Sequence, residues 1–123
     1  MSFLTKDQIL SADDITIEVV DVSEWGGKVN VKSMTGSDRD KFEMLIVNAK
    51  VKDGELIRDA KFEHYRAKLC SLCMCGKDGE LLFTQEDVTA LGNKSAAAIQ
   101  RVFNVASRLN KITPEDVEEV VKN

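Results

Sequence analysis

The stretch that most restricts the fold of this chain is an amphipathic segment at about residues 94–109. Its apolar side chains recur at spacings of three and four residues, which places them on one side of an α-helix. They are Ile99, Val102, Phe103, Ala106 and Leu109. A helix of this kind is stable in water only when its apolar side is covered, so the segment must pack against other elements of a folded domain.

A β-hairpin is predicted at about residues 15–34. Apolar and polar residues alternate in the runs at 15–22 and 28–34, as in strands with one buried face, and two glycines lie between the runs. The lone tryptophan, Trp25, falls at the predicted tip. It is a candidate anchor for a partner protein, and the alternative that it folds back onto the sheet is equally open.

Two further helices are predicted from capping patterns. Residues 37–52 begin with Ser and Asp at the spacing of a capping box and continue with apolar residues at helical intervals. Residues 84–92 begin with Thr and Asp at the same spacing and end in a glycine, which favours a helix stop.

A short terminal helix is predicted from Thr113 onward, because a proline follows this residue at the first helical position. Val117, Val120 and Val121 would share one side of that helix, and little sequence remains to cover them. These valines are a candidate partner-binding patch. The alternative is that they pack on the apolar stripe of residues 94–109.

Residues 55–70 fit either a helix or a strand. Tyr65, Leu69 and Leu72 have helical spacing, whereas the run that follows alternates like a strand. The Asp78-Gly79 pair between two apolar runs favours a strand at about 65–75 paired with residues 80–83, although a helix reaching Cys70 stays open.

The resulting prediction is one α+β domain that spans residues 1–123. It has two β-hairpins, at about 15–34 and 65–83, packed with four to five helices. The longest helix is expected at about 94–109.

All three cysteines lie within residues 70–75, and the chain has one histidine, His64. Structural zinc sites usually combine two Cys or His pairs, and here there is a single Cys-x-x-Cys. On a helix His64 would be turned away from Cys70, and on a strand it would be too far from it. Reduced cysteines pack as small apolar side chains, so we expect buried thiols, no metal site, no catalytic site and no cofactor.

The composition limits the classes of partner. With 43% hydrophobic and 31% charged residues, the chain is typical of a globular protein. Its net charge is −4 and its basic residues are interleaved with acidic ones, which argues against a nucleic-acid ligand. No stretch has the length and apolar character of a membrane span or a signal peptide, so we expect no membrane partner and a cytoplasmic location.

The C-terminal half carries a recognisable series of short motifs between residues 65 and 112. In order, they are Arg-Ala-x-Leu, an Asp-Gly turn, Leu-Phe followed by Thr and acidic residues, Ala-Leu-Gly-x-Lys-Ser-Ala-Ala-Ala, and a helix that ends in Arg-Leu-Asn. This series resembles the tail assembly chaperones of long-tailed bacteriophages, the family typified by the lambda G protein. The predicted first hairpin and the helix start after it also fit the layout of that family.

The resemblance implies a non-catalytic role. Such chaperones bind the tape measure protein and keep it soluble in the host cytoplasm while tail tube subunits are recruited, and they are absent from the mature virion. A longer form, made by ribosomal frameshifting, contacts the tube protein. The last three residues, 121–123, can be encoded as GTA AAA AAC, which contains a slippery heptamer.

Apolar surface that a client or a second copy can cover also predicts a homo-oligomer. Two other functions are alternatives to the chaperone hypothesis. One is a small structural protein of the virion tail or connector, and the other is a cysteine-based zinc or redox module.

Overall fold

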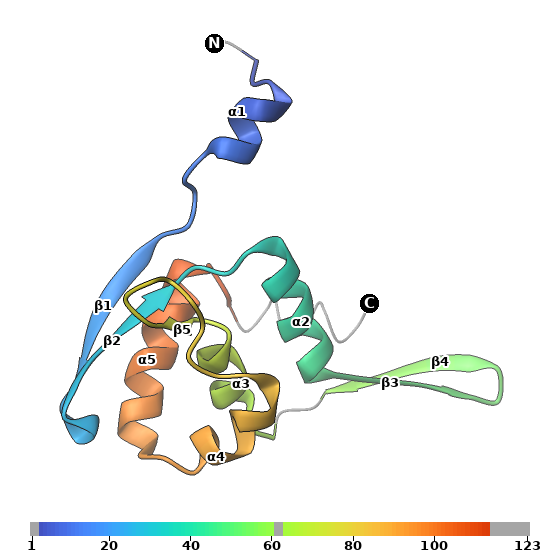
Figure 1. Ribbon diagram of the computed structural model, residues 1–123. Coiled ribbons are helices and arrows are strands. Elements are labelled where there is room, and N and C mark those ends of the chain that lie inside the picture. Colours follow the sequence, from blue (N-terminus) through green and yellow to red (C-terminus); the bar gives the residue numbers. More distant parts are fainter. Residues whose placement is uncertain (1–2, 61–62, 114–123) are drawn as a thin grey trace.

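A computed structural model describes residues 3–60 and 63–113 of the chain, and it confirms the α+β class (Figure 1). Within these ranges there are five α-helices, a three-stranded antiparallel sheet of order β1-β2-β5, and a separate two-stranded ribbon. In chain order the elements are α1 (Lys6–Ser11), β1 (Ile17–Val22), the 3-10 turn η1 (Ser23–Trp25), β2 (Gly27–Lys32), α2 (Gly36–Ile46), β3 (Val47–Lys52), β4 (Glu55–Ala60), α3 (Tyr65–Ser71), β5 (Met74–Cys75), the 3-10 turn η2 (Gln85–Asp87), α4 (Val88–Gly92) and α5 (Ala96–Leu109).

The first hairpin is confirmed. Strands β1 and β2 pair in antiparallel register from Ile17 opposite Lys32 to Val22 opposite Gly27. Their alternation turns one face inward, where Val22 and Val31 are completely buried. At the tip, Gly26 adopts φ +76°, a conformation that glycine reaches without a steric cost.

The long helix is also confirmed. Helix α5 begins after Ser95, whose hydroxyl accepts a hydrogen bond from the backbone N–H of Ala98. It packs on α3 and against β1 and β2. The side chains that it buries are Ala98, Ile99, Val102 and Ala106. The apolar stripe of the sequence therefore forms one wall of the core.

The helix predicted at 37–52 is shorter than expected and begins earlier. Thr35, and not Ser37, caps it, and α2 ends at Ile46. The chain then enters a two-stranded ribbon, β3–β4, which was not predicted from the sequence. Its turn is Asp53-Gly54 with φ values of +53° and +81°, the geometry that a two-residue hairpin needs.

The second predicted hairpin, at 65–83, is largely wrong. Residues 65–71 form helix α3, the alternative that the sequence left open. The only strand of this stretch is Met74–Cys75, which pairs with β2, and a single bridge joins Cys75 to Leu81 around the turn at Gly79. The ambiguous residues 55–70 thus contain both a strand, β4, and a helix.

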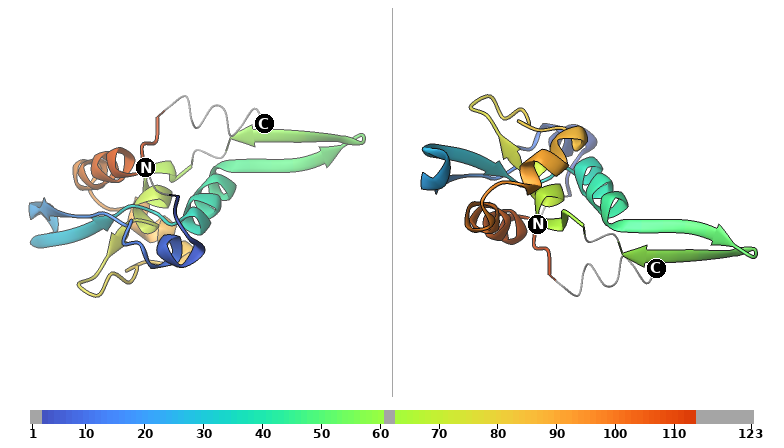
Figure 2. Two further views of the ribbon diagram at one scale, coloured as in Figure 1. Left: turned by 90° about the horizontal axis from the view of Figure 1, so that it is seen from above. Right: turned by 90° about the horizontal axis from the view of Figure 1, so that it is seen from below.

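Two parts of the chain project from the core. Helix α1 stands away from the body beyond the start of β1, and the β3–β4 ribbon extends on another side (Figures 1 and 2). Every residue of α1 is exposed. The helix predicted after Thr113, with Val117, Val120 and Val121, lies outside the described residues.

Candidate partner-binding site

An apolar cavity of about 290 Å³ opens next to Trp25. Its walls come from the tip of the first hairpin, from β5, from the loop before η2 and from α4. The lining residues are Trp25, Val29, Met74, Leu82, Phe83, Asp87, Ala90, Leu91 and Lys94. Six of these side chains are large and apolar, and the two charged ones are Asp87 and Lys94.

Trp25 is packed partly on the core and also lines the cavity. Its side chain is partly buried against the core, so it does fold back on the domain. It also remains a wall of the open cavity. The predicted position of Trp25 at the hairpin turn is therefore correct. The cavity beside it is formed by elements that lie far along the chain.

An ion pair holds the turn that carries Trp25 against helix α5. The two terminal nitrogens of Arg101 donate to the two carboxylate oxygens of Glu24 at 2.7 and 3.0 Å. This paired hydrogen bonding is the strongest geometry that an arginine offers to a carboxylate. It lowers the pKa of Glu24 to about 2 and raises the pKa of Arg101.

The cavity suits apolar side chains better than a polar ligand. Asp87 already accepts hydrogen bonds from the backbone N–H of Thr84 at 2.9 Å and from its hydroxyl at 3.2 Å, as part of a capping box. By volume the cavity could hold about ten waters, which would find few polar partners on its walls. Its chemistry is that of a recess for aliphatic or aromatic groups.

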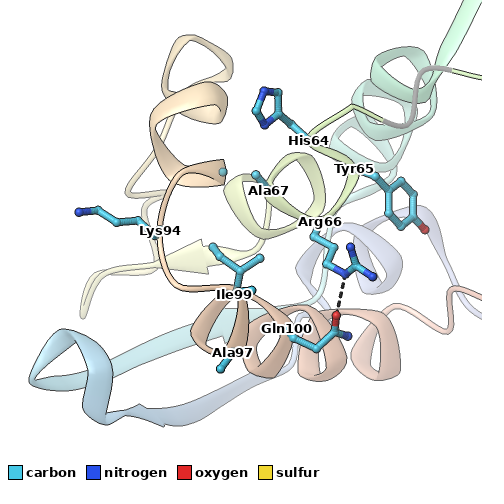
Figure 3. Close-up of a pocket in the computed structure, with 10 residues that line it drawn as sticks. His64, Tyr65, Arg66, Ala67, Lys94, Ala97, Ile99 and Gln100 are labelled. Atoms are coloured by element: carbon cyan, nitrogen blue, oxygen red, sulfur yellow. Dashed lines mark hydrogen bonds between the residues drawn. The ribbon is translucent and has the colours of Figure 1, made fainter.

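A second, more polar groove of about 650 Å³ lies between α3 and the start of α5 (Figure 3). Arg66 crosses it and donates to the side-chain oxygen of Gln100 at 2.6 Å. His64 lines one end with its ring against Gly92, and its side chain is 25% exposed. The Nε2 atom of His64 lies 3.5 Å from a carboxylate oxygen of the exposed Glu63, which is not among the described residues that line this groove.

The cysteines lie in the core, as predicted. Cys70, Cys73 and Cys75 are free and buried. Burial raises the pKa of the first two thiols to about 12 and also raises that of Cys75. In the part of the chain that the structure describes, no group of His, Cys, Asp and Glu side chains is arranged to hold a metal ion.

Comparison with known proteins decides the family. Residues 6–123 match the family described as phage tail assembly chaperone. The chain belongs to this family. A solved structure titled "Structure of bacteriophage HK97 tail assembly chaperone" shares the fold, with a TM-score of 0.57 and 15% sequence identity over 87% of this chain and 94% of that chain. Comparison with curated proteins gives no match.

Beyond the β3–β4 ribbon, two further features of this tail assembly chaperone were not predicted from the sequence. One is the set of cavity walls beyond Trp25, which come from separate elements. The other is helix α1, whose signal was present as Thr5 and Gln8 at capping-box spacing before Ile9 and Leu10. Of the predicted partner-binding residues, Trp25 lines the apolar cavity, and the three valines lie outside the described residues. No helix in the described ranges is long and apolar enough to cross a membrane.

Proposed function

We propose that this chaperone binds the tape measure protein, keeps it soluble and helps to recruit tail tube subunits, without catalysis. The observation that carries the proposal is the family match over residues 6–123. The proposed partner contacts are Trp25 on the cavity and Val117, Val120 and Val121 near the end of the chain.

The physical chemistry of the chain supports a carrier of an apolar client. A tape measure protein is a long helical polypeptide whose apolar surface must be covered until the tube encloses it. A chaperone needs apolar recesses for such a client and a charged exterior that keeps the complex dispersed. The cavity at Trp25 is one apolar recess that a client or a second copy of the chain can cover, and a net charge of −4 contributes to the charged exterior.

We also propose that the chaperone acts as a homo-oligomer in the host cytoplasm and is absent from the mature virion. A longer form, made by frameshifting at residues 121–123, contacts the tail tube protein. Reading the gene tests this form, because other codons than GTA AAA AAC there, or a closed −1 frame downstream, would exclude slippage at these residues.

Co-expression with the tape measure gene tests the central claim. We expect the tape measure protein to move from the pellet to the soluble fraction and to co-purify with the chaperone. The variant Val117→Ser/Val120→Ser/Val121→Ser should lose co-purification, while the neighbouring change Glu118→Gln/Glu119→Gln should keep it. A tape measure protein that stays insoluble with the wild-type chaperone would contradict the proposal. Mass spectrometry of purified particles separates a chaperone from a virion component, since only the latter is retained.

A further inference from the structure

Helix α1 and the residues just before it present large apolar side chains that the described part of the chain leaves exposed. Phe3 and Leu4, just before the helix, are 100% and 70% exposed. Ile9 and Leu10 within it are 56% and 74% exposed. Four exposed large apolar side chains within nine residues are typical of a surface that binds a partner. We call residues 3–11 the arm.

The arm is nevertheless built to hold a defined helix. The hydroxyl of Thr5 accepts from the N–H of Gln8 at 3.2 Å, and the N–H of Thr5 donates to the side-chain oxygen of Gln8 at 2.9 Å. Leu4 and Ile9 occupy the positions of a hydrophobic staple around this capping box. A six-residue helix is marginally stable in water by itself. A capping box and a hydrophobic staple on so short a helix therefore favour a helix that packs on a partner surface.

The Trp25 cavity has the complementary properties. It is a recess with mostly apolar walls, and its two charged lining residues are Asp87 and Lys94. The arm carries one charge of each sign, Lys6 and Asp7, next to its apolar side chains. The cavity therefore offers an opposite charge to each charge of the arm.

The arm does not fill the cavity of its own chain. It leaves the domain at Ile17, the end of β1 far from the hairpin tip, and points away from the body (Figure 1). Trp25 lies at the opposite end of that hairpin. A second copy of the chain can bring the same arm to the cavity without reversing the direction of the chain at residues 12–16.

We propose that the arm of one copy docks in the Trp25 cavity of a second copy, with its apolar side chains against Leu82, Phe83 and the indole of Trp25. This inference rests on the homo-oligomer of the proposed function and names its contact. It assigns Trp25 to a contact between copies of this chain.

Sedimentation of the full-length chain in the absence of any tape measure protein tests the contact. The arm variant Ile9→Ser/Leu10→Ser should raise the dissociation constant for self-association about a hundredfold, because two aliphatic side chains lose their burial. Both residues are exposed within the chain, so the domain should keep its melting temperature. Met44→Ser, at a residue that is 78% exposed on α2, is the matched control and should associate like the wild type.

A cavity variant provides the second half of the test. Ala90→Phe should fill the recess from an exposed position on α4 and weaken association to a similar degree, while Thr89→Phe, on the same helix but outside the cavity lining, should not. Mixed together, the arm variant and the cavity variant should form a one-to-one pair, because one keeps an intact cavity and the other an intact arm.

Emission of the sole tryptophan gives an independent readout. As the wild-type concentration rises, Trp25 should shift to shorter wavelength when the arm of a second copy covers its ring. A wild-type chain that stays monomeric, variants that associate like the wild type, or a mixture that forms no pair would each overturn the proposal. None of these results depends on the tape measure protein. If they exclude the arm contact, co-purification with the tape measure protein would still support the proposed function.

Discussion

Asn110 ties the end of helix α5 to the segment between β2 and α2 through the backbone of Met34. Its side-chain oxygen accepts a hydrogen bond from the Met34 N–H at 2.6 Å. Its side-chain nitrogen donates to the Ala106 carbonyl at 2.8 Å and lies 3.5 Å from the sulfur of Cys73. One amide therefore joins three elements that are far apart in the sequence.

Replacing this amide should destabilise the domain. Asn110→Ala leaves the partly buried Met34 N–H without its acceptor, and we expect a loss of about 1–3 kcal/mol in the free energy of unfolding. Urea denaturation measures it. Asn104→Ala is the control, because Asn104 accepts only an exposed hydrogen bond from Gln100 on the same helix and should change stability by less than about 0.5 kcal/mol. Equal losses in the two variants would contradict a special role for Asn110.

The Glu24–Arg101 pair predicts a pH dependence with a definite sign. Arg101 lowers the folded pKa of Glu24 to about 2, below the value of about 4.3 expected in the unfolded chain. A depressed carboxyl pKa contributes stability that is present above the unfolded pKa and is lost as the pH falls towards the folded pKa. The pair should therefore stabilise the domain at neutral pH and cease to do so between about pH 4.3 and 2.

Glu24→Gln should remove that part of the acid dependence. Urea denaturation at several pH values should show a smaller loss of stability for Glu24→Gln than for the wild type across this window. Glu86→Gln, at an exposed position in η2, is the matched control for the loss of one carboxylate. Parallel curves for Glu24→Gln and the wild type would show that the ion pair contributes nothing to folding.

Some elements could be predicted from sequence because their signals are local. Helix α5 has one apolar side and a serine cap, and the β1–β2 hairpin has simple alternation around a glycine turn. Helix α3 has a weaker signal. Tyr65 and Leu69 have helical spacing, but Ala67, Leu69, Cys70 and Ser71 are all buried, so the polar side of the helix is too narrow to mark the period clearly. The same run consequently resembled a strand.

The Asp-Gly pairs show the limit of turn signals. Asp53-Gly54 closes a full hairpin with six paired residues on each side, whereas the pair at 78–79 lies in a loop closed by a single bridge. The turn residues are identical, and pairing depends on what flanks them. The Trp25 cavity was beyond prediction for a related reason, since its walls meet only after β5, η2 and α4 have packed together.

The buried cysteines predict unreactive thiols in the folded chaperone. Reaction needs the thiolate, and a pKa of about 12 for Cys70 and Cys73 lowers its fraction at pH 8 about a thousandfold relative to a free cysteine. A colorimetric thiol reagent should therefore label the native protein far more slowly than the protein in guanidinium, where all three cysteines should react. Metal analysis should find no stoichiometric zinc. Rapid native labelling, or one zinc per chain, would restore the metal or redox interpretation.

The close approach of His64 to Gly92 predicts a coupling between these two residues. A Cβ atom at position 92 would lie 2.4 Å from the Nδ1 atom of His64, so Gly92→Ala should destabilise the domain by about 1–3 kcal/mol, although alanine favours a helix. His64 itself has φ +56°, which glycine adopts more easily than histidine. In the His64→Gly background the ring is gone, and Gly92→Ala should become neutral or stabilising. A double-mutant cycle in urea measures this coupling, and additive effects would show that the imidazole moves aside freely.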